Sequence, residues 1–246
     1  MIMRSFFNKE KDREFKPSNK IVLASGTSGS GISFVSQLMA MELTKLSSVS
    51  VTELGKPYFY SALGMEKRFY NRGFVNYFDM LRANEHIDFS KKNEFLGVNW
   101  YVKLANDSES LPISAVFRAI HMPKEEYCLF DCSGLSNELS LSLLAEADLP
   151  IIVIDPLPSK LILARDFLES ARISLPEAVL VVNQMNNGVH RAELSRFLGT
   201  KDYFSIPSVP QEYIYKAEYN SIPVSELPEI GPSMAKTQDM LSKLFQ

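Results

Sequence analysis

Cysteine, histidine and long apolar runs are all scarce in this chain. The two cysteines, Cys128 and Cys132, lie four residues apart in one expected strand, too far along an extended chain to form a disulfide easily. We therefore expect buried thiols, as in a cytoplasmic protein. The three histidines are scattered without metal-ligand spacing. No run reaches the length of a membrane-spanning helix, and the N-terminus lacks the apolar core of a signal peptide.

A strong excess of charge is lacking too. The formal net charge is −3, which gives no general argument for nucleic-acid binding. The 246 residues, 46% of them hydrophobic, suit one globular α/β domain. We expect residues 1–19, polar and mixed in charge, to form an arm outside the fold, and residues 20–230 to form the domain. Residues 231–246 predict a C-terminal amphipathic helix that packs on the domain; the alternative, contact with a membrane, is weakened by its few cations.

One stretch organises the rest of the chain. Residues 21–24 form a short apolar run typical of a strand buried on both faces, a turn rich in glycine and serine follows, and a helical pattern begins at Ser33. Residues 49–51 predict a second strand. Together these elements make a βαβ unit of a parallel sheet. Further strands are predicted at 98–104, 127–131, 147–156, 178–183 and 204–210, and helices at 114–121 and 160–171.

The turn has the spacing of a phosphate-binding loop. Gly26 and Gly31 stand as the two glycines of G-x-x-x-x-G-K-[ST], and Ser33 stands where the magnesium-binding hydroxyl belongs. Glycines there let backbone N–H groups converge on a phosphate at a helix N-terminus. Position 32, however, is Ile rather than Lys. A Gly/Ser turn without a ligand is the alternative.

The segment SGTSGSGIS resembles the deviant phosphate loop S-G-K-G-G-x-G-K-[ST] of the MinD/ParA ATPases. Thr27 replaces the lysine that in this family reaches the partner subunit's phosphates, and Ile32 replaces the second lysine. The resemblance implies a P-loop NTPase-like, predominantly parallel sheet of about seven strands with helices on both faces, and ATP or ADP with Mg²⁺ as cofactor. The loop residues it assigns to nucleotide binding are Gly26, Thr27, Ser28, Gly29, Ser30, Gly31, Ile32 and Ser33.

Later segments extend the resemblance. Asp131 ends the apolar run YCLFD, as the Walker B acid ends its strand, so Ser33 and Asp131 become the magnesium candidates. Asn183 resembles the residue that hydrogen-bonds the base, and backbone around Pro207 and Val209 would wall the base pocket. In the first switch, Glu53 falls near one acid of the family's D-x-D motif and Gly55 near the other, which is lost.

An aromatic-rich segment, residues 54–84, follows the second strand. Its pattern predicts a helix from about Glu66, with an apolar face made of Phe69, Tyr70, Phe74, Tyr77, Phe78 and Leu81. Core packing is the favoured interpretation, and a protein-binding surface is the alternative.

Three hypotheses about function remain open. The first is a catalytically degenerate MinD/ParA-like protein that positions partners, for instance in pilus or secretion assembly as in the TadZ/CpaE group. The second is an ATPase with a substitute cation such as Lys56, and the third is a scaffold with an empty pocket in which Ile32 fills the phosphate position. The resemblance implies a homodimer, with cytoplasmic or peripheral inner-membrane or polar localisation.

Overall fold

One eight-stranded sheet runs through the protein in the order β3-β4-β2-β5-β1-β6-β7-β8. The computed structural model describes residues 19–87, 91–230, 234, 235, 237, 239, 241 and 243–245. All neighbouring strands pair in parallel except β3 and β4, which form a short antiparallel hairpin at one edge. The strands are β1 (Asn19–Ala24), β2 (Val49–Glu53), β3 (Glu94–Phe95), β4 (Val98–Tyr101), β5 (Tyr127–Asp131), β6 (Leu149–Ile154), β7 (Val179–Met185) and β8 (Phe204–Pro207).

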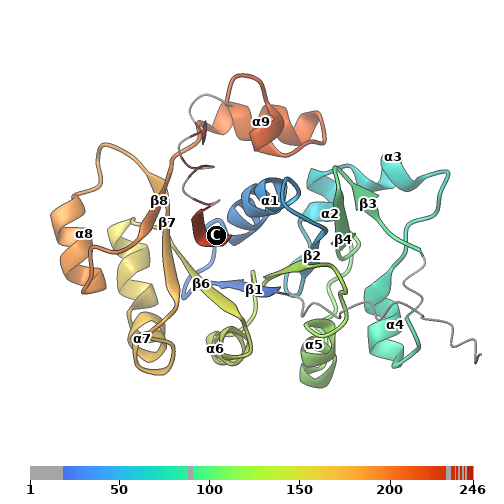
Figure 1. Ribbon diagram of the computed structural model, residues 1–246, viewed down its shortest axis with the longest axis horizontal. Coiled ribbons are helices and arrows are strands. Elements are labelled where there is room, and N and C mark those ends of the chain that lie inside the picture. Colours follow the sequence, from blue (N-terminus) through green and yellow to red (C-terminus); the bar gives the residue numbers. More distant parts are fainter. Residues whose placement is uncertain are drawn as a thin grey trace, which may run out of the picture.

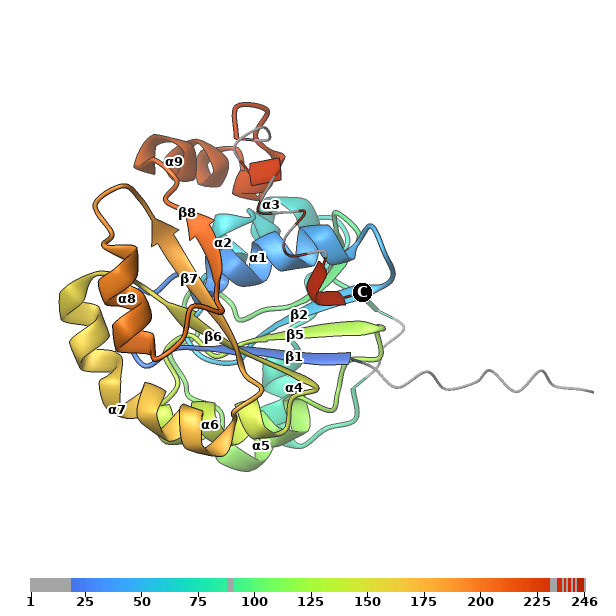
Figure 2. The ribbon, with the colours of Figure 1, turned by 60° about the vertical axis from the view of Figure 1, so that its left-hand side comes forward.

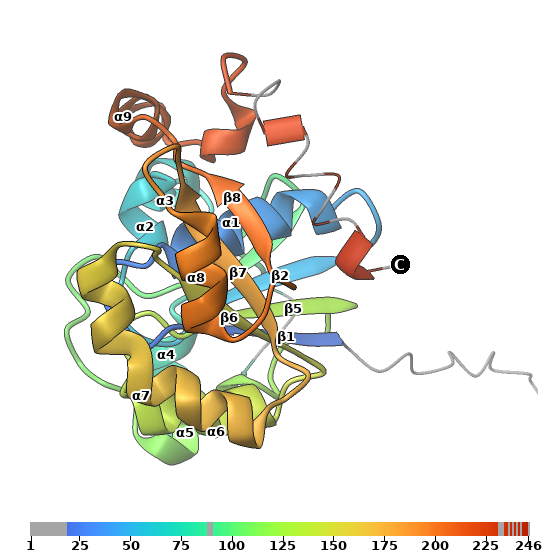
Figure 3. The same cartoon turned by 90° about the vertical axis from the view of Figure 1, so that its left-hand side faces the viewer.

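Helices cover both faces of the sheet (Figure 1). The face above the sheet in that view carries α1 (Ile32–Leu43), α2 (Phe59–Ala62), α3 (Met65–Phe69) and α9 (Gln211–Tyr219). The opposite face carries α4 (Tyr77–Ala83), α5 (Ile113–Ala119), α6 (Asn137–Ala145) and α7 (Pro158–Ser174), and α8 (Arg191–Leu198) lies with α7 beside the β7–β8 end (Figures 2 and 3). Two 3₁₀ turns, η1 (Val224–Glu226) and η2 (Lys243–Phe245), follow α9.

Strand side chains alternate between two apolar cores. In β1, Ile21 and Leu23 enter the core under α1, whereas Val22 and Ala24 enter the core facing α4 to α8. Strands buried on both faces need continuous apolar runs, which is why the sequence pattern located them. The predicted α/β fold with a mostly parallel sheet is confirmed, with eight strands in place of about seven.

Two expectations concern the chain ends. Residues 1–18 of the expected arm lie outside the described residues, and Asn19 is already the first residue of β1. Of the expected C-terminal helix, residues 231–233 and several later ones also lie outside them. Met234 and Leu241 are buried in the core under α1.

The single helix predicted from Glu66 through Leu81 is wrong. Two separate helices, α3 and α4, occupy this segment, and Gly73 between them has φ +74°. The Asn76 side chain accepts a hydrogen bond from Phe78 N (3.2 Å) and so caps a new helix start. Tyr70, placed on the apolar face by the pattern, is 84% exposed. Phe59, Tyr77 and Phe78 are fully buried, as core packing requires.

Candidate functional site: a phosphate loop without lysine

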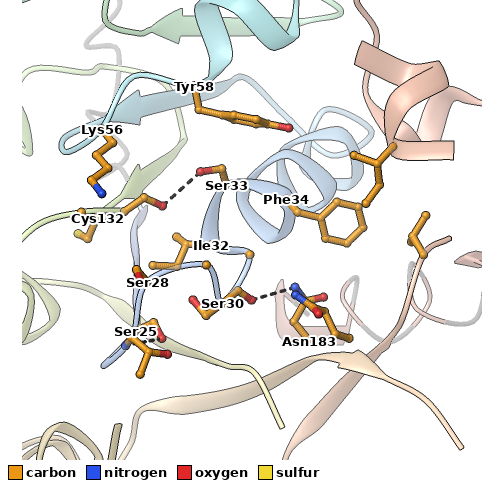
Figure 4. A pocket seen from close by; sticks show the side chains of 18 of the residues that line it. Ser25, Ser28, Ser30, Ile32, Ser33, Phe34, Lys56, Tyr58, Cys132 and Asn183 are labelled. Atoms are coloured by element: carbon orange, nitrogen blue, oxygen red, sulfur yellow. Dashed lines mark hydrogen bonds between the residues drawn. The ribbon is translucent and has the colours of Figure 1, made fainter. Parts of the chain in front are cut away.

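The loop between β1 and α1 lines a pocket of about 890 Å³ at the carboxyl ends of the parallel strands (Figure 4). Gly29 (φ +68°) and Gly31 (φ +87°) are left-handed, and Gly31 is the N-cap residue of α1. This backbone turns the loop around the N-terminus of a 12-residue helix, where unpaired amide groups and the helix dipole favour an anion. All the loop residues predicted to bind nucleotide, from Gly26 to Ser33, line this pocket.

Neither position that carries a lysine in the resembled loops supplies a cation here. Thr27 is half-buried, and its backbone N–H donates to Ser25 Oγ (3.3 Å). Ile32 is 6% exposed and belongs to the core under α1, although it also contributes to the pocket wall. The loop therefore presents a cradle of backbone and hydroxyl groups without positive charge from its own side chains.

Asn183 lies in the pocket wall at β7, and its side-chain amide is hydrogen-bonded to the backbone of the phosphate loop. Its Nδ2 donates to Ser30 O (3.0 Å), and the side chain is nearly fully buried. A Cβ at position 31 would lie 2.1 Å from this nitrogen and would displace the amide from Ser30 O, and the left-handed backbone of Gly31 (φ +87°) favours glycine by itself. The base contact predicted for Asn183 stays a prediction.

Asp131, at the end of β5, is fully buried with one oxygen unused. Its Oδ1 accepts from Ser133 N (2.7 Å), while its Oδ2 has no hydrogen-bond partner in the described part of the chain. Burial raises the pKa of this carboxyl group, and the backbone N–H of Ser133 and the nearby hydroxyl groups of Ser133 and Ser33 oppose the rise. The Ser33 and Ser133 hydroxyls lie 3.2 Å apart. A buried unsatisfied acceptor beside a loop hydroxyl is the donor set that fits a hydrated Mg²⁺.

Glu53 ends β2 directly beside Asp131, its register partner. Its Oε1 accepts from the backbone N–H groups of Tyr58 (2.6 Å) and Phe59 (3.0 Å), and its Oε2 accepts from Lys103 N (3.0 Å). Burial raises the pKa of Glu53 to about 8 against these donors, with a further rise from the Asp131 charge. The carboxyl group therefore ties the start of α2 to the end of β4.

Several residues that shape the pocket escaped sequence reasoning. Pro207 and Val209, which were expected to wall a base, line the pocket, and their contact with a base stays a prediction. Tyr58 and Glu218 line it too, and a hydrogen bond from Tyr58 Oη to Glu218 Oε1 (2.9 Å) joins them. Contacts this distant along the chain leave no local pattern.

A lysine from α7 braces the loop. Lys160 Nζ donates to Gly29 O (2.7 Å) and to Asp155 Oδ2 (2.8 Å). The ion pair connects the end of β6 to the first turn of α7, so its members are close in sequence, but its contact with the loop could not be deduced from spacing.

Other kinds of site find no support in the described ranges. They contain no group of three or more His, Cys, Asp or Glu side chains that could hold a metal ion by themselves. Among the same residues, no helix is both long and apolar enough to cross a bilayer. Cys128 and Cys132 are buried thiols.

No protein-family model matches the chain, and no curated protein sequence matches it either. Solved structures do match. A ParA family ATPase of Chlorobium tepidum is 14% identical over 87% of this chain and 94% of its own, with a TM-score of 0.69. A putative plasmid partition protein of Borrelia burgdorferi, bound to AMPPNP, is 17% identical over 93% and 98% (TM-score 0.69). The MinC:MinD cell division complex of Aquifex aeolicus matches at 17% identity over 93% and 96% (TM-score 0.68).

The sheet order, the glycine loop and the strand-end acid define a P-loop NTPase-like fold. More narrowly, the structural neighbours are MinD/ParA ATPases, so the chain has the MinD/ParA-like fold that the sequence resemblance predicted.

Proposed function

We propose that this protein binds an adenine nucleotide with Mg²⁺ and acts as a positioning scaffold, without hydrolysing the nucleotide at the rate of a working ATPase. The observation that carries the proposal is an intact backbone cradle without lysine in the pocket, with an unsatisfied Asp131 oxygen buried directly behind the pocket residue Ser133. An unpaired buried oxygen lowers folding stability, so in a protein that no longer bound nucleotide a hydrogen-bond donor beside Asp131 Oδ2, or an apolar residue in place of Asp131, would be stabilising.

The chain's own residues divide the binding work. Backbone amides of the loop would hold phosphate oxygens, and Ser33 Oγ with Asp131 Oδ2 would hold Mg²⁺ directly or through water. Pro207 and Val209 would wall the base. Bound Mg²⁺ would neutralise part of the phosphate charge. Asn183 supports the cradle through Ser30 O, and it stays the candidate contact for the base.

The missing groups argue against fast hydrolysis. Each preorganised donor removed from a developing oxyanion costs about 10²–10³ in rate in analogous sites, and this loop lacks two lysines. The second acid of the first switch is also lost, because Gly55 stands in its place. Ground-state binding tolerates such losses better than catalysis does, since binding is shared among many backbone groups.

Partners follow from the neighbours. The Borrelia neighbour is named for plasmid partition and was solved with AMPPNP, and the Aquifex neighbour was solved as a MinC:MinD complex. By analogy, this protein would form a homodimer and bind a protein partner of a bacterial positioning, pilus or secretion system. A cytoplasmic or peripheral location at the inner membrane or the pole is part of the same proposal.

The test is calorimetric titration with Mg-ATP and Mg-ADP, followed by phosphate release. Micromolar binding without turnover, weakened by EDTA and by Asp131→Ala, is the expected result. The matched control is Asp166→Ala, which removes an exposed carboxylate on α7 away from the pocket lining. Turnover at ordinary rates would refute the proposal in favour of an ATPase with a substitute cation. Absence of binding at millimolar nucleotide would refute it in favour of a scaffold with an empty pocket.

A further inference from the structure

The loops after β2 and β5 are joined beyond the ends of their strands. Leu54 N donates to Asp131 O (2.9 Å) and Lys56 N donates to Ser133 O (2.8 Å), so the parallel ladder continues alongside the phosphate loop. Between these two bonds, a Cβ on Gly55 would lie 1.8 Å from Ser133 O. At the position that the resemblance assigns to the second acid of the first switch, glycine lets two loops touch, and this contact fixes the backbone of Lys56.

The side chain of Lys56 is guided by a second glycine. A Cβ on Gly134 (φ +82°) would lie 2.5 Å from Lys56 Cγ, 2.9 Å from Cδ and 3.1 Å from Cε. The whole aliphatic stem therefore lies along the backbone of Gly134. In Figure 4 the amine of Lys56 points from its loop toward the side of the pocket where Cys132 lies.

The ammonium group of Lys56 is available to a ligand. Lys56 is the one lysine or arginine among the described residues that line the pocket, and no partner for its Nζ is found among them. The neighbouring cations are engaged: Lys160 Nζ by Gly29 O and Asp155, and Lys103 Nζ by Gly55 O (2.6 Å). Among the described residues, Lys56 thus brings the single uncommitted positive charge to this pocket, and it does so from outside the phosphate loop.

We propose that Lys56 binds the phosphate groups of the nucleotide and replaces the charge that the phosphate loop lacks. This inference rests on the proposed function. The geometry differs from that of a loop lysine because the cation arrives from the β2–α2 loop and lies against the β5–α6 loop. A phosphate bound by both Lys56 and the cradle would therefore fix the phosphate loop, the β2–α2 loop and the β5–α6 loop relative to one another. Nucleotide binding could then order this face of the protein without hydrolysis.

The experiment measures the Kd of Mg-ATP for the full chain and for Lys56→Met, Lys56→Arg and Lys67→Met, with urea denaturation of each variant. Met keeps the aliphatic stem over Gly134 and removes the charge. Lys67 is an exposed α3 lysine outside the pocket lining and serves as the matched control. We expect Lys56→Met to weaken binding about tenfold to hundredfold, Lys56→Arg to stay within about fivefold, and Lys67→Met to leave Kd unchanged.

Each other outcome overturns the inference. Equal affinity of the parent protein and Lys56→Met would refute the role of Lys56 while leaving nucleotide binding in place. Equal losses in Lys56→Met and Lys56→Arg, or a matching loss of folding stability, would show a structural role in the loop contact. Failure of the parent protein to bind Mg-ATP would overturn the proposed function, and this inference with it.

Discussion

Replacing Gly55 with alanine should break the contact between the loops after β2 and β5. The added Cβ would meet Ser133 O at 1.8 Å, Ser133 C at 2.8 Å and Leu135 N at 3.3 Å, all of them backbone atoms. Because backbone cannot swing aside as a flexible side chain does, one loop must move. The hydrogen bond from Lys56 N to Ser133 O is then lost.

The cost can be worked out from these contacts. Forced overpacking costs about 1–3 kcal/mol, and a lost intramolecular hydrogen bond adds about 1 kcal/mol. The free energy of unfolding should therefore fall by about 2–4 kcal/mol, which for a chain of this size lowers Tm by roughly 5–15 °C. Gly188→Ala is the matched control: its Cβ would meet only the side-chain oxygen Asn186 Oδ1, at 3.1 Å, and should cost less than about 0.5 kcal/mol.

Equilibrium urea denaturation of both variants, with the slope m compared, is the appropriate assay. A Gly55→Ala protein as stable as Gly188→Ala would refute the reasoning, because it would mean that the two loops separate freely. Gly55→Ala should also weaken Mg-ATP binding if Lys56 is placed by this contact.

Three further predictions follow from the site. Because burial raises the pKa of Glu53 to about 8, above the ordinary value near 4.5, the native state keeps a proton that the unfolded state releases. Stability should therefore fall as pH rises from about 5 to about 8, by at most about 1.4 kcal/mol per pH unit, and Glu53→Gln should flatten this slope in pH-dependent denaturation. Tyr58→Phe removes the hydrogen bond to Glu218 across the pocket and should speed nucleotide dissociation a few-fold in stopped-flow displacement; an unchanged rate would show that the contact does not restrain the ligand. Asp131→Asn should raise folding stability, since a buried unsatisfied charge is relieved, while it lowers affinity for Mg-nucleotide; loss of stability would contradict the account of Oδ2.

Sequence reasoning succeeded where one local pattern decided the structure. The run YCLFD predicted β5 at its observed bounds, Tyr127–Asp131, because a strand buried on both faces must be apolar throughout. The spacing of Gly26 and Gly31 located the turn, because this spacing is typical of a loop between a strand and a helix. The parallel order of the strands then brought Asp131 to the same edge as the loop.

Sequence reasoning failed where it gave a local helix break too little weight, and where a contact between distant segments decided the structure. The helix expected over 66–81 is interrupted at Gly73, and the helical spacing of its aromatic residues outweighed that signal. Three contacts join residues that only the sheet topology brings together. Gly55 packs against Ser133, Lys56 packs against Gly134, and Lys160 donates a hydrogen bond to Gly29.

The glycines of the loop are weaker support for nucleotide than their spacing suggests. A Cβ on Gly26 would lie 2.8 Å from Phe167 Cβ and 3.1 Å from Ala164 Cα, and Gly31 has φ +87°, so packing requires glycine at the first position and backbone conformation requires it at the second. The motif would therefore persist in a protein that had lost its ligand. The unsatisfied Asp131 oxygen and the uncommitted Lys56 ammonium have no such packing reason: the first destabilises the fold and the second adds nothing to it. A ligand that carries both Mg²⁺ and phosphate would satisfy the two at once, and for that reason the proposal of a nucleotide rests on this carboxylate and this lysine.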